Sequence, residues 1–140
     1  MAEDDDDDVL FFREAIHSLS LPCELIVVNN GEHAVNYFSM SKVLPDFVFL
    51  DINMPKLNGI EALKAIKTMH PSNDLHVVML STSMSEPMVE QSYRFGASIY
   101  IQKPTNFNDL KEYLNYCLTQ LGHTAIQPGF ILNRHLRDAF

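Results

Sequence analysis

Short apolar runs alternate along the chain with longer stretches in which apolar residues recur every three or four positions. The first pattern is typical of buried strands and the second of amphipathic helices. The predicted strands are 25–28, 47–50, 76–80 and 99–101. The predicted helices are 9–19, 32–40, 59–69, 86–95 and 107–121. Because strands and helices alternate with short connections, the pattern predicts an α/β fold with a parallel sheet covered by helices on both faces.

Composition and charge narrow the class of protein. A chain of 140 residues is long enough for one domain with its own core. The formal charge is −8, but six acids lie together at 3–8, and without them the balance is −2. The chain has no cluster of basic residues of the kind that binds nucleic acid. No apolar run reaches membrane-spanning length, and the acidic start is unlike a signal peptide. Cys23 and Cys117 lack metal-ligand spacing, which favours reduced thiols and a cytoplasmic protein.

Three polar residues follow predicted strands and are candidates for a site. Asp51 comes directly after a run of four apolar residues, and Pro55 and Gly59 then break the chain and open a helix. Ser81 and Lys103 also follow apolar strands. In an open α/β sheet, ligand sites lie at the carboxyl ends of the strands, so these three side chains are expected at one edge. Alone, an aspartate there is usually a turn residue or a helix cap.

The chemistry of such a group can be argued from the residue types. A carboxylate such as Asp51 can attack phosphorus and form an acyl phosphate. A divalent cation is needed to shield its charge from the incoming phosphoryl group. Mg²⁺ prefers oxygen ligands in octahedral geometry, which further carboxylates and a backbone carbonyl would supply. Lys103 offers a mobile positive charge for a phosphoryl oxygen.

Five short motifs together carry a resemblance to a known family. They are the acidic run before the first helix, Asp51-Ile52-Asn53-Met54-Pro55 with Gly59, Leu80-Ser81-Thr82-Ser83, Gly96-Ala97-Ser98-Ile99-Tyr100, and Gln102-Lys103-Pro104. Over about residues 3–121 the chain resembles the receiver domain of bacterial two-component response regulators, in the single-domain, chemotaxis-type form. The spacing of Asp51, Ser81 and Lys103 matches that family without a gap. The resemblance implies a flavodoxin-like, doubly wound parallel sheet of strand order 2-1-3-4-5.

The resemblance also implies a metal site. By this resemblance, Mg²⁺ would be bound by Glu3, Asp4, Asp51 and the backbone carbonyl of Asn53. An acidic run in isolation is more often a solvated tail. Counting back from the first helix selects Glu3 and Asp4, but a displacement of the register by one residue stays open because the run is so uniform. Asp8 is expected to cap that helix.

Ser81 and Lys103 are assigned by the resemblance to two phosphoryl oxygens. The family makes the peptide bond before Pro104 cis to aim the lysine inward, and cis bonds are essentially a proline property. For Ser81, the alternative is a hydroxyl that caps the next helix, and Thr82 and Ser83 compete with it as the phosphoryl-binding hydroxyl. For Lys103, the alternative is an exposed lysine before a turn.

Tyr100 matches the switch aromatic of the family. Phosphorylation is expected to draw the loop of Ser81 toward the phosphate, which lets the Tyr100 ring turn inward and changes the face formed by 86–95 and 99–101. That face is the predicted docking surface for a target protein. The alternative is a half-buried strand tyrosine without a switching role.

One departure from the family concerns the first strand. Only Met1 and Ala2 precede the acidic run, so the first strand, which would lie inside the sheet, is apparently absent. A gap there would leave backbone groups unpaired. It could reflect a truncated start, a strand donated by a partner in an exchanged homodimer, or insertion of the strand-like segment 129–133. The expected division is a receiver domain at 1–122 and a tail at 123–140. The alternative to strand insertion is that this tail forms a short helix or a loose segment on the surface.

Three functions compete at this point. The first is a response regulator that accepts a phosphoryl group on Asp51 from a sensor histidine kinase or a histidine phosphotransfer protein, and is not otherwise an enzyme. The second is a receiver-like interaction module that takes no phosphate. The third is a haloacid-dehalogenase-type phosphatase, whose general acid is expected two residues after the nucleophile, where this chain has Asn53.

Overall fold

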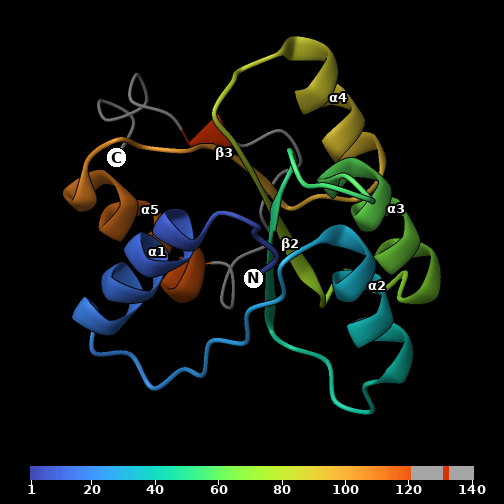
Figure 1. The fold of residues 1–140 in the computed structure, drawn as a ribbon, viewed down its shortest axis with the longest axis horizontal. Coiled ribbons are helices and arrows are strands. Elements are labelled where there is room, and N and C mark those ends of the chain that lie inside the picture. The colour runs from blue at the N-terminus through green and yellow to red at the C-terminus, as the bar shows by residue number, and fades with distance from the viewer. Residues whose placement is uncertain (121–130, 133–140) are drawn as a thin grey trace.

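The computed structural model describes residues 1–120 and 131–132, and its elements follow the predicted alternation (Figure 1). The helices are α1 (Asp6–Ser18), α2 (Gly31–Met40), α3 (Gly59–Met69), α4 (Glu86–Arg94) and α5 (Phe107–Gln120). The strands are β1 (Phe47–Asp51), β2 (His76–Ser81), β3 (Ile99–Gln102) and β4 (Ile131–Leu132). No helix in this part of the chain is both long and apolar enough to cross a bilayer.

The strands form one parallel sheet in the order β1-β2-β3-β4. In its register, Asp51 of β1 is paired with Leu80, and Ser81 of β2 is paired with Gln102 of β3. The backbone N–H of Lys103 donates to the carbonyl of Ser81 at 2.7 Å. The ends of three neighbouring strands therefore meet at the same edge, as the sequence predicts for the candidate site.

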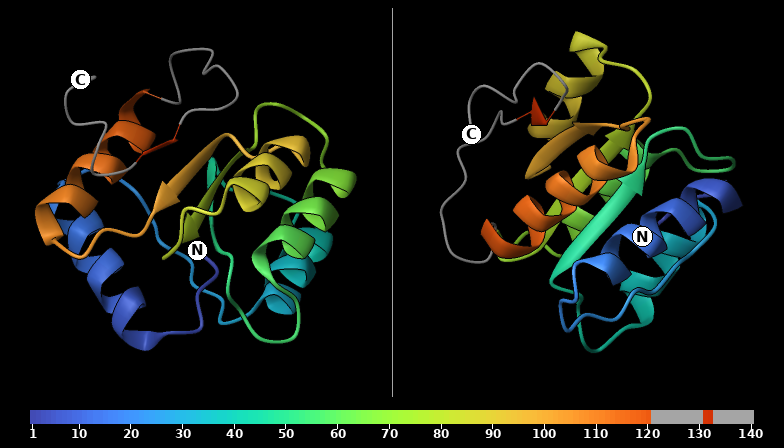
Figure 2. Two further views of the ribbon diagram at one scale, coloured as in Figure 1. Left: turned by 90° about the horizontal axis from the view of Figure 1, so that it is seen from above. Right: turned by 90° about the vertical axis from the view of Figure 1, so that its left-hand side faces the viewer.

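Helices cover both faces of the sheet, which confirms the doubly wound architecture. Helices α1 and α5 lie on one face, and α2, α3 and α4 lie on the other (Figure 2). Each strand contributes to two apolar cores, since neighbouring residues point to opposite faces. Leu50 packs with the α2–α4 side, whereas Phe49 packs with the α1–α5 side. Burial on both faces explains why these strands are continuous apolar runs rather than alternating ones.

The first three residues occupy the place expected for the missing first strand. The N–H of Ala2 donates to the carbonyl of Phe49 at 2.8 Å, and the carbonyl of Ala2 accepts from the N–H of Asp51 at 3.0 Å. On the other side, the N–H of Glu3 donates to the carbonyl of Val28 at 3.0 Å. As expected, no full first strand is present among the described residues; an isolated bridge at Ala2 takes its position instead. Three residues are too few to produce an apolar pattern, yet they satisfy the backbone groups of β1.

The predicted strand 25–28 is present only as an isolated bridge between Val28 and Ala2. Beyond this bridge, the terminal amino group of Met1 donates to the carbonyl of Ile26 at 2.8 Å. Across the sheet, Val28, Ala2, β1, β2 and β3 nevertheless follow the 2-1-3-4-5 order.

The C-terminal strand does not replace the first strand. β4 lies within the predicted segment 129–133 but pairs with β3, through Tyr100–Ile131 and Ile101–Leu132, on the opposite side of the sheet. Within one chain this segment therefore does not lie next to β1, where the first three residues fill the position; insertion into a partner stays untested. The boundary at residue 122 and the rest of the tail lie outside the described residues and stay a prediction.

Candidate functional site

Asp51 ends β1 at the edge of the sheet, with only 3% of its surface exposed. Its backbone is fixed by the hydrogen bond to Ala2. The N–H of Gly59, the first residue of α3, donates to the carbonyl of Ile52 at 2.9 Å, so the next helix begins directly against the strand exit. Any Cβ at Gly59 would lie 2.3 Å from the carbonyl oxygen of Asp51, which explains why this position needs glycine.

Glu3, Asp4 and Asp51 form a group of carboxylates suited to a cation. Oxygen atoms from all three lie within 4.8 Å of one another, and Glu3 and Asp51 are buried. Burial raises the pKa of Glu3 and of Asp51, although the ammonium of Lys103 acts in the opposite direction. An all-oxygen donor set with excess negative charge fits a hard divalent cation such as Mg²⁺. The group contains the predicted pair Glu3 and Asp4, and the assignment of these residues as metal ligands stays a prediction.

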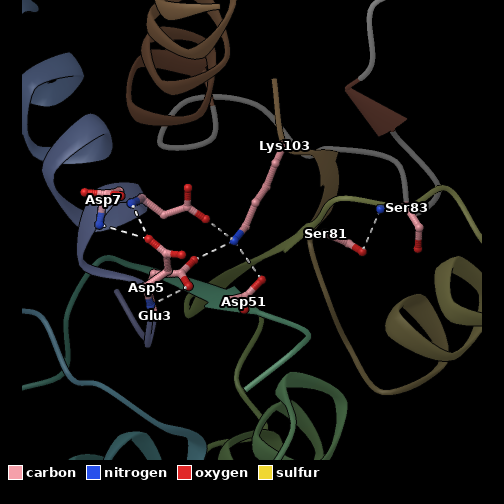
Figure 3. Close-up of polar contacts among 8 residues, drawn as sticks. Glu3, Asp5, Asp7, Asp51, Ser81, Ser83 and Lys103 are labelled. Carbon is pink, nitrogen blue, oxygen red and sulfur yellow. Dashed lines mark hydrogen bonds and ion pairs between the residues drawn. The ribbon is translucent and has the colours of Figure 1, made fainter. Parts of the chain in front are cut away.

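Lys103 supplies the positive charge of the site. Its Nζ lies 2.6 Å from Glu3 Oε2, 2.7 Å from Asp8 Oδ2 and 3.0 Å from Asp51 Oδ1 (Figure 3). Burial alone would lower the pKa of Lys103, but the hydrogen bonds to Asp8, Glu3 and Asp51 outweigh burial and raise it. The lysine is therefore held in its charged form.

The expected cis bond before Pro104 is wrong, because no peptide bond among the described residues is cis. Lys103 reaches Asp51 all the same. Its backbone is aligned by the hydrogen bond to Ser81 at the end of β2, and its long side chain spans the remaining distance.

The start of α1 differs from the prediction. Asp5, not Asp8, is the N-cap, and its carboxylate accepts hydrogen bonds from the N–H groups of Asp7 at 2.9 Å and Asp8 at 3.1 Å. The helix begins at Asp6, three residues earlier than expected, because successive aspartates at a helix start are favoured by its dipole. Since Asp8 is not the cap, its side chain is available to Lys103.

Ser81 lies at the end of β2 and is fully buried. Its hydroxyl accepts a hydrogen bond from the N–H of Ser83 at 3.2 Å, and Figure 3 shows it turned toward Ser83 rather than toward Asp51. Asn53 is exposed in the loop between β1 and α3. The structure thus brings Glu3, Asp4, Asp51 and Lys103 together, and the roles of all the predicted site residues, Ser81 and Asn53 included, stay predictions.

Tyr100 is fully buried within β3, so its ring is already inward. Its hydroxyl donates to the carbonyl of Ser83 at 2.9 Å, and its backbone N–H donates to the hydroxyl of Tyr93 at 3.1 Å. The side chain is therefore buried rather than half-buried, and its role as a switch stays a prediction. A buried tyrosine hydroxyl needs a partner, and the carbonyl of Ser83 in the loop between β2 and α4 provides one.

Two residues of this region are missed by reasoning from the sequence alone. Asp8 contacts Lys103, but it is one of five consecutive aspartates and no local signal distinguishes it. Tyr93 reads as an ordinary helical tyrosine, whereas burial raises its pKa to about 12 and its hydroxyl contacts the backbone of Tyr100. Both contacts depend on the packing of helices against the sheet, which short motifs do not specify.

Comparison with known proteins agrees with this geometry. The family profile of the response regulator receiver domain matches residues 1–115. Chemotaxis protein CheY of Listeria monocytogenes is 35% identical over 111 residues, covering 77% of this chain and 90% of that protein. Response regulator Rcp1 of Synechocystis is 30% identical over 115 residues, covering 79% and 78%. The transcriptional regulatory protein DegU of Brevibacillus brevis is 36% identical over 108 residues, 76% of this chain, which spans only 45% of DegU.

Solved structures give the same result. The phosphorylated cyanobacterial phytochrome response regulator RcpA matches with a TM-score of 0.76 at 31% identity, covering 84% of this chain and 91% of RcpA. The Mn²⁺-bound form of Rcp1 matches with a TM-score of 0.75 at 26% identity, covering 90% and 95%. Since the family profile spans most of the chain and the sheet has the expected order, this protein belongs to the response regulator receiver domain family.

Proposed function

We propose that this response regulator accepts a phosphoryl group on Asp51 from the phosphohistidine of a sensor histidine kinase or a histidine phosphotransfer protein. The observation that carries the proposal is the position of the buried Asp51 carboxylate, 3.0 Å from Lys103 and grouped with Glu3 and Asp4. The proposal is supported because a carboxylate can attack phosphorus, a lysine can donate to phosphoryl oxygens and an acid pair suits a cation.

In the proposed reaction, an oxygen of Asp51 attacks phosphorus. The new O–P bond forms as the N–P bond of the donor breaks, and the imidazole departs with the electron pair and takes up a proton. Lys103 donates to a phosphoryl oxygen. Ser81 donates to another after its hydroxyl turns away from Ser83. Attack of water on the acyl phosphate later returns Asp51 and free phosphate, so transfer and hydrolysis are the only reactions we assign.

The cofactor in this proposal is Mg²⁺. Glu3, Asp4, Asp51 and the backbone carbonyl of Asn53 would hold it, and when bound it neutralises charge between the carboxylates and the phosphoryl group. The carboxylate group described above supports this assignment, as does the likeness to the Mn²⁺-bound form of Rcp1.

Signalling is proposed to pass through Tyr100 to the surface of α4 and β3, where a target protein docks. The Tyr100 hydroxyl is bonded to Ser83, two residues beyond Ser81, so movement of this loop toward a phosphoryl group acts directly on the ring. Because the ring is already inward, phosphorylation is expected to favour an existing arrangement over others. β4 pairs along the outer side of β3, so a partner approaching there meets β4 as well.

The proposal is completed by a cytoplasmic location, no contact with nucleic acid or membrane, and assembly as a homodimer by strand exchange. The strand available for exchange is β4, which joins the sheet at its outer edge. Light scattering of the whole chain and of a chain ending at residue 120 would test the dimer. A mass of one protomer for the whole chain would contradict it.

Intact mass after incubation with acetyl phosphate and Mg²⁺ tests the central claim. We expect a gain of about 80 Da, the mass of one phosphoryl group, in the wild type and no gain in Asp51→Asn. Absence of a gain in the wild type would overturn the proposal in favour of the interaction module. Sustained turnover of a generic phosphomonoester would instead favour the phosphatase, although position 53 is Asn rather than an acid.

A further inference from the structure

The three carboxylates bonded to Lys103 differ in one respect. Glu3 and Asp51 belong to the group that fits a cation, whereas Asp8 does not. Asp8 is on the first turn of α1, and its side chain is 45% exposed, compared with 1% for Glu3 and 5% for Asp51. One ammonium is thus shared between two buried carboxylates and one that remains in contact with solvent.

Cation binding and Lys103 compete for the same oxygens. A divalent cation at the acidic group draws on the carboxylates of Glu3 and Asp51, which are the two buried partners of Lys103. The ammonium and the cation also repel each other, and this repulsion is strong where water is largely excluded. Lys103 therefore needs a carboxylate outside the cation site to which its charge can move.

Asp8 is placed to be that carboxylate. The Asp5 cap fixes the first turn of α1 and aims Asp8 at Lys103, with Asp8 Oδ2 2.7 Å from Nζ. A small cavity of about 40 Å³ lies beside the pair; Glu3, Asp8 and Lys103 line it together with apolar residues, so the Lys103 ammonium is kept on the carboxylate side. Asp7, its neighbour on the same turn, is exposed and makes no side-chain contact with Lys103.

We infer that Asp8 is a positioning residue for the metal site, which retains the Lys103 ammonium when Glu3 and Asp51 turn to a divalent cation. The inference rests on the proposed function, since it concerns the Mg²⁺ of that reaction. It assigns to one member of the aspartate run a role that its neighbours cannot share, because only Asp8 among residues 5–8 has a side chain bonded to Lys103.

Titration calorimetry with Mg²⁺ at constant ionic strength tests the inference. Asp8→Asn is expected to weaken Mg²⁺ binding about fivefold, since the pair is partly exposed. Asp7→Asn removes the same formal charge from the same turn and is expected to weaken binding less than about twofold. Asp8→Glu, which keeps the charge, is expected to restore most of the affinity.

A double-mutant cycle with Lys103→Met separates positioning from simple charge. In the Lys103→Met background, Asp8→Asn is expected to have no more effect than Asp7→Asn. Equal effects of Asp8→Asn and Asp7→Asn in the wild-type background would overturn the inference, as would a full Asp8→Asn effect without Lys103. A wild type that binds no Mg²⁺ would overturn the proposed function and this inference with it, so the two failures are distinguishable.

Discussion

The close contact between the start of α3 and the exit of β1 permits a quantitative test of the site. A Cβ added at Gly59 would lie 2.3 Å from the carbonyl oxygen of Asp51 and 2.8 Å from Cα of Ile52. Ordinary contacts between such atoms need about 3.5 Å. Both neighbours are backbone atoms, and Asp51 is further held by Ala2 at 3.0 Å. Gly59→Ala must therefore displace either the helix or the strand exit by about 1 Å.

Two effects of Gly59→Ala oppose each other. Alanine favours a helix interior over glycine by about 1 kcal/mol, and by less at the first helical position. Overpacking against a rigid neighbour costs about 1–3 kcal/mol, and a contact this short with backbone lies near the upper end. We expect a net loss of about 2 kcal/mol in the free energy of unfolding. For a chain of this length that corresponds to a melting temperature lower by about 6–10 °C.

Urea unfolding followed by circular dichroism measures the stability of Gly59→Ala, and acetyl phosphate labelling measures its phosphorylation, which we expect to be slower. Gly96→Ala is the matched control. Gly96 has φ +98°, so alanine is strained there, but its Cβ would meet only the flexible side chain of Lys67, from 3.3 Å. This control is expected to lose about 1 kcal/mol and to keep a normal rate of labelling. A Gly59→Ala variant with wild-type stability or labelling rate would refute the reasoning.

Three further predictions concern buried groups. Burial raises the pKa of Asp51, so the ionised carboxylate lowers the stability of the folded protein. With chelator present at pH 7, Asp51→Asn should therefore have a higher melting temperature than the wild type. This difference should shrink as the pH falls into the ordinary carboxyl range, and a difference independent of pH would contradict the prediction. Tyr93→Phe removes the acceptor for the Tyr100 N–H and should cost about 1 kcal/mol in urea unfolding. Burial raises the pKa of Cys117 to about 12, so a thiol reagent should modify only exposed Cys23 until the protein is unfolded.

Most of the fold could be predicted because its strands are buried on both faces. Continuous apolar runs at 47–50 and 77–80 identify such strands with little ambiguity, and the predicted helix 59–69 has the observed bounds. The bridge at Ala2 could not be predicted, since a period of two cannot be recognised in so few residues. The fold depends there on backbone hydrogen bonds that carry no side-chain pattern.

The candidate site was predictable to the extent that sheet topology determines it. Glu3, Asp51 and Lys103 meet because parallel strands place their carboxyl ends at one edge, and this holds across 100 positions between Glu3 and Lys103. The choice of Asp5 as cap and Asp8 as lysine partner was not predictable, because five identical residues offer no contrast. Packing of α1 against the sheet makes that choice.

The first three residues connect the stability of the sheet to the chemistry of its edge. Ala2 closes the gap beside β1, and the next residue, Glu3, carries a buried carboxylate into the cation site. The same Glu3 accepts a hydrogen bond from the N–H of Asp5, the cap of α1, at 3.2 Å. Neutralising the acidic group would thus strengthen the segment that completes the sheet and begins α1. The negative charge that lowers stability at this edge is also what would attract the proposed cation, so cation binding and folding of this segment are expected to be thermodynamically linked.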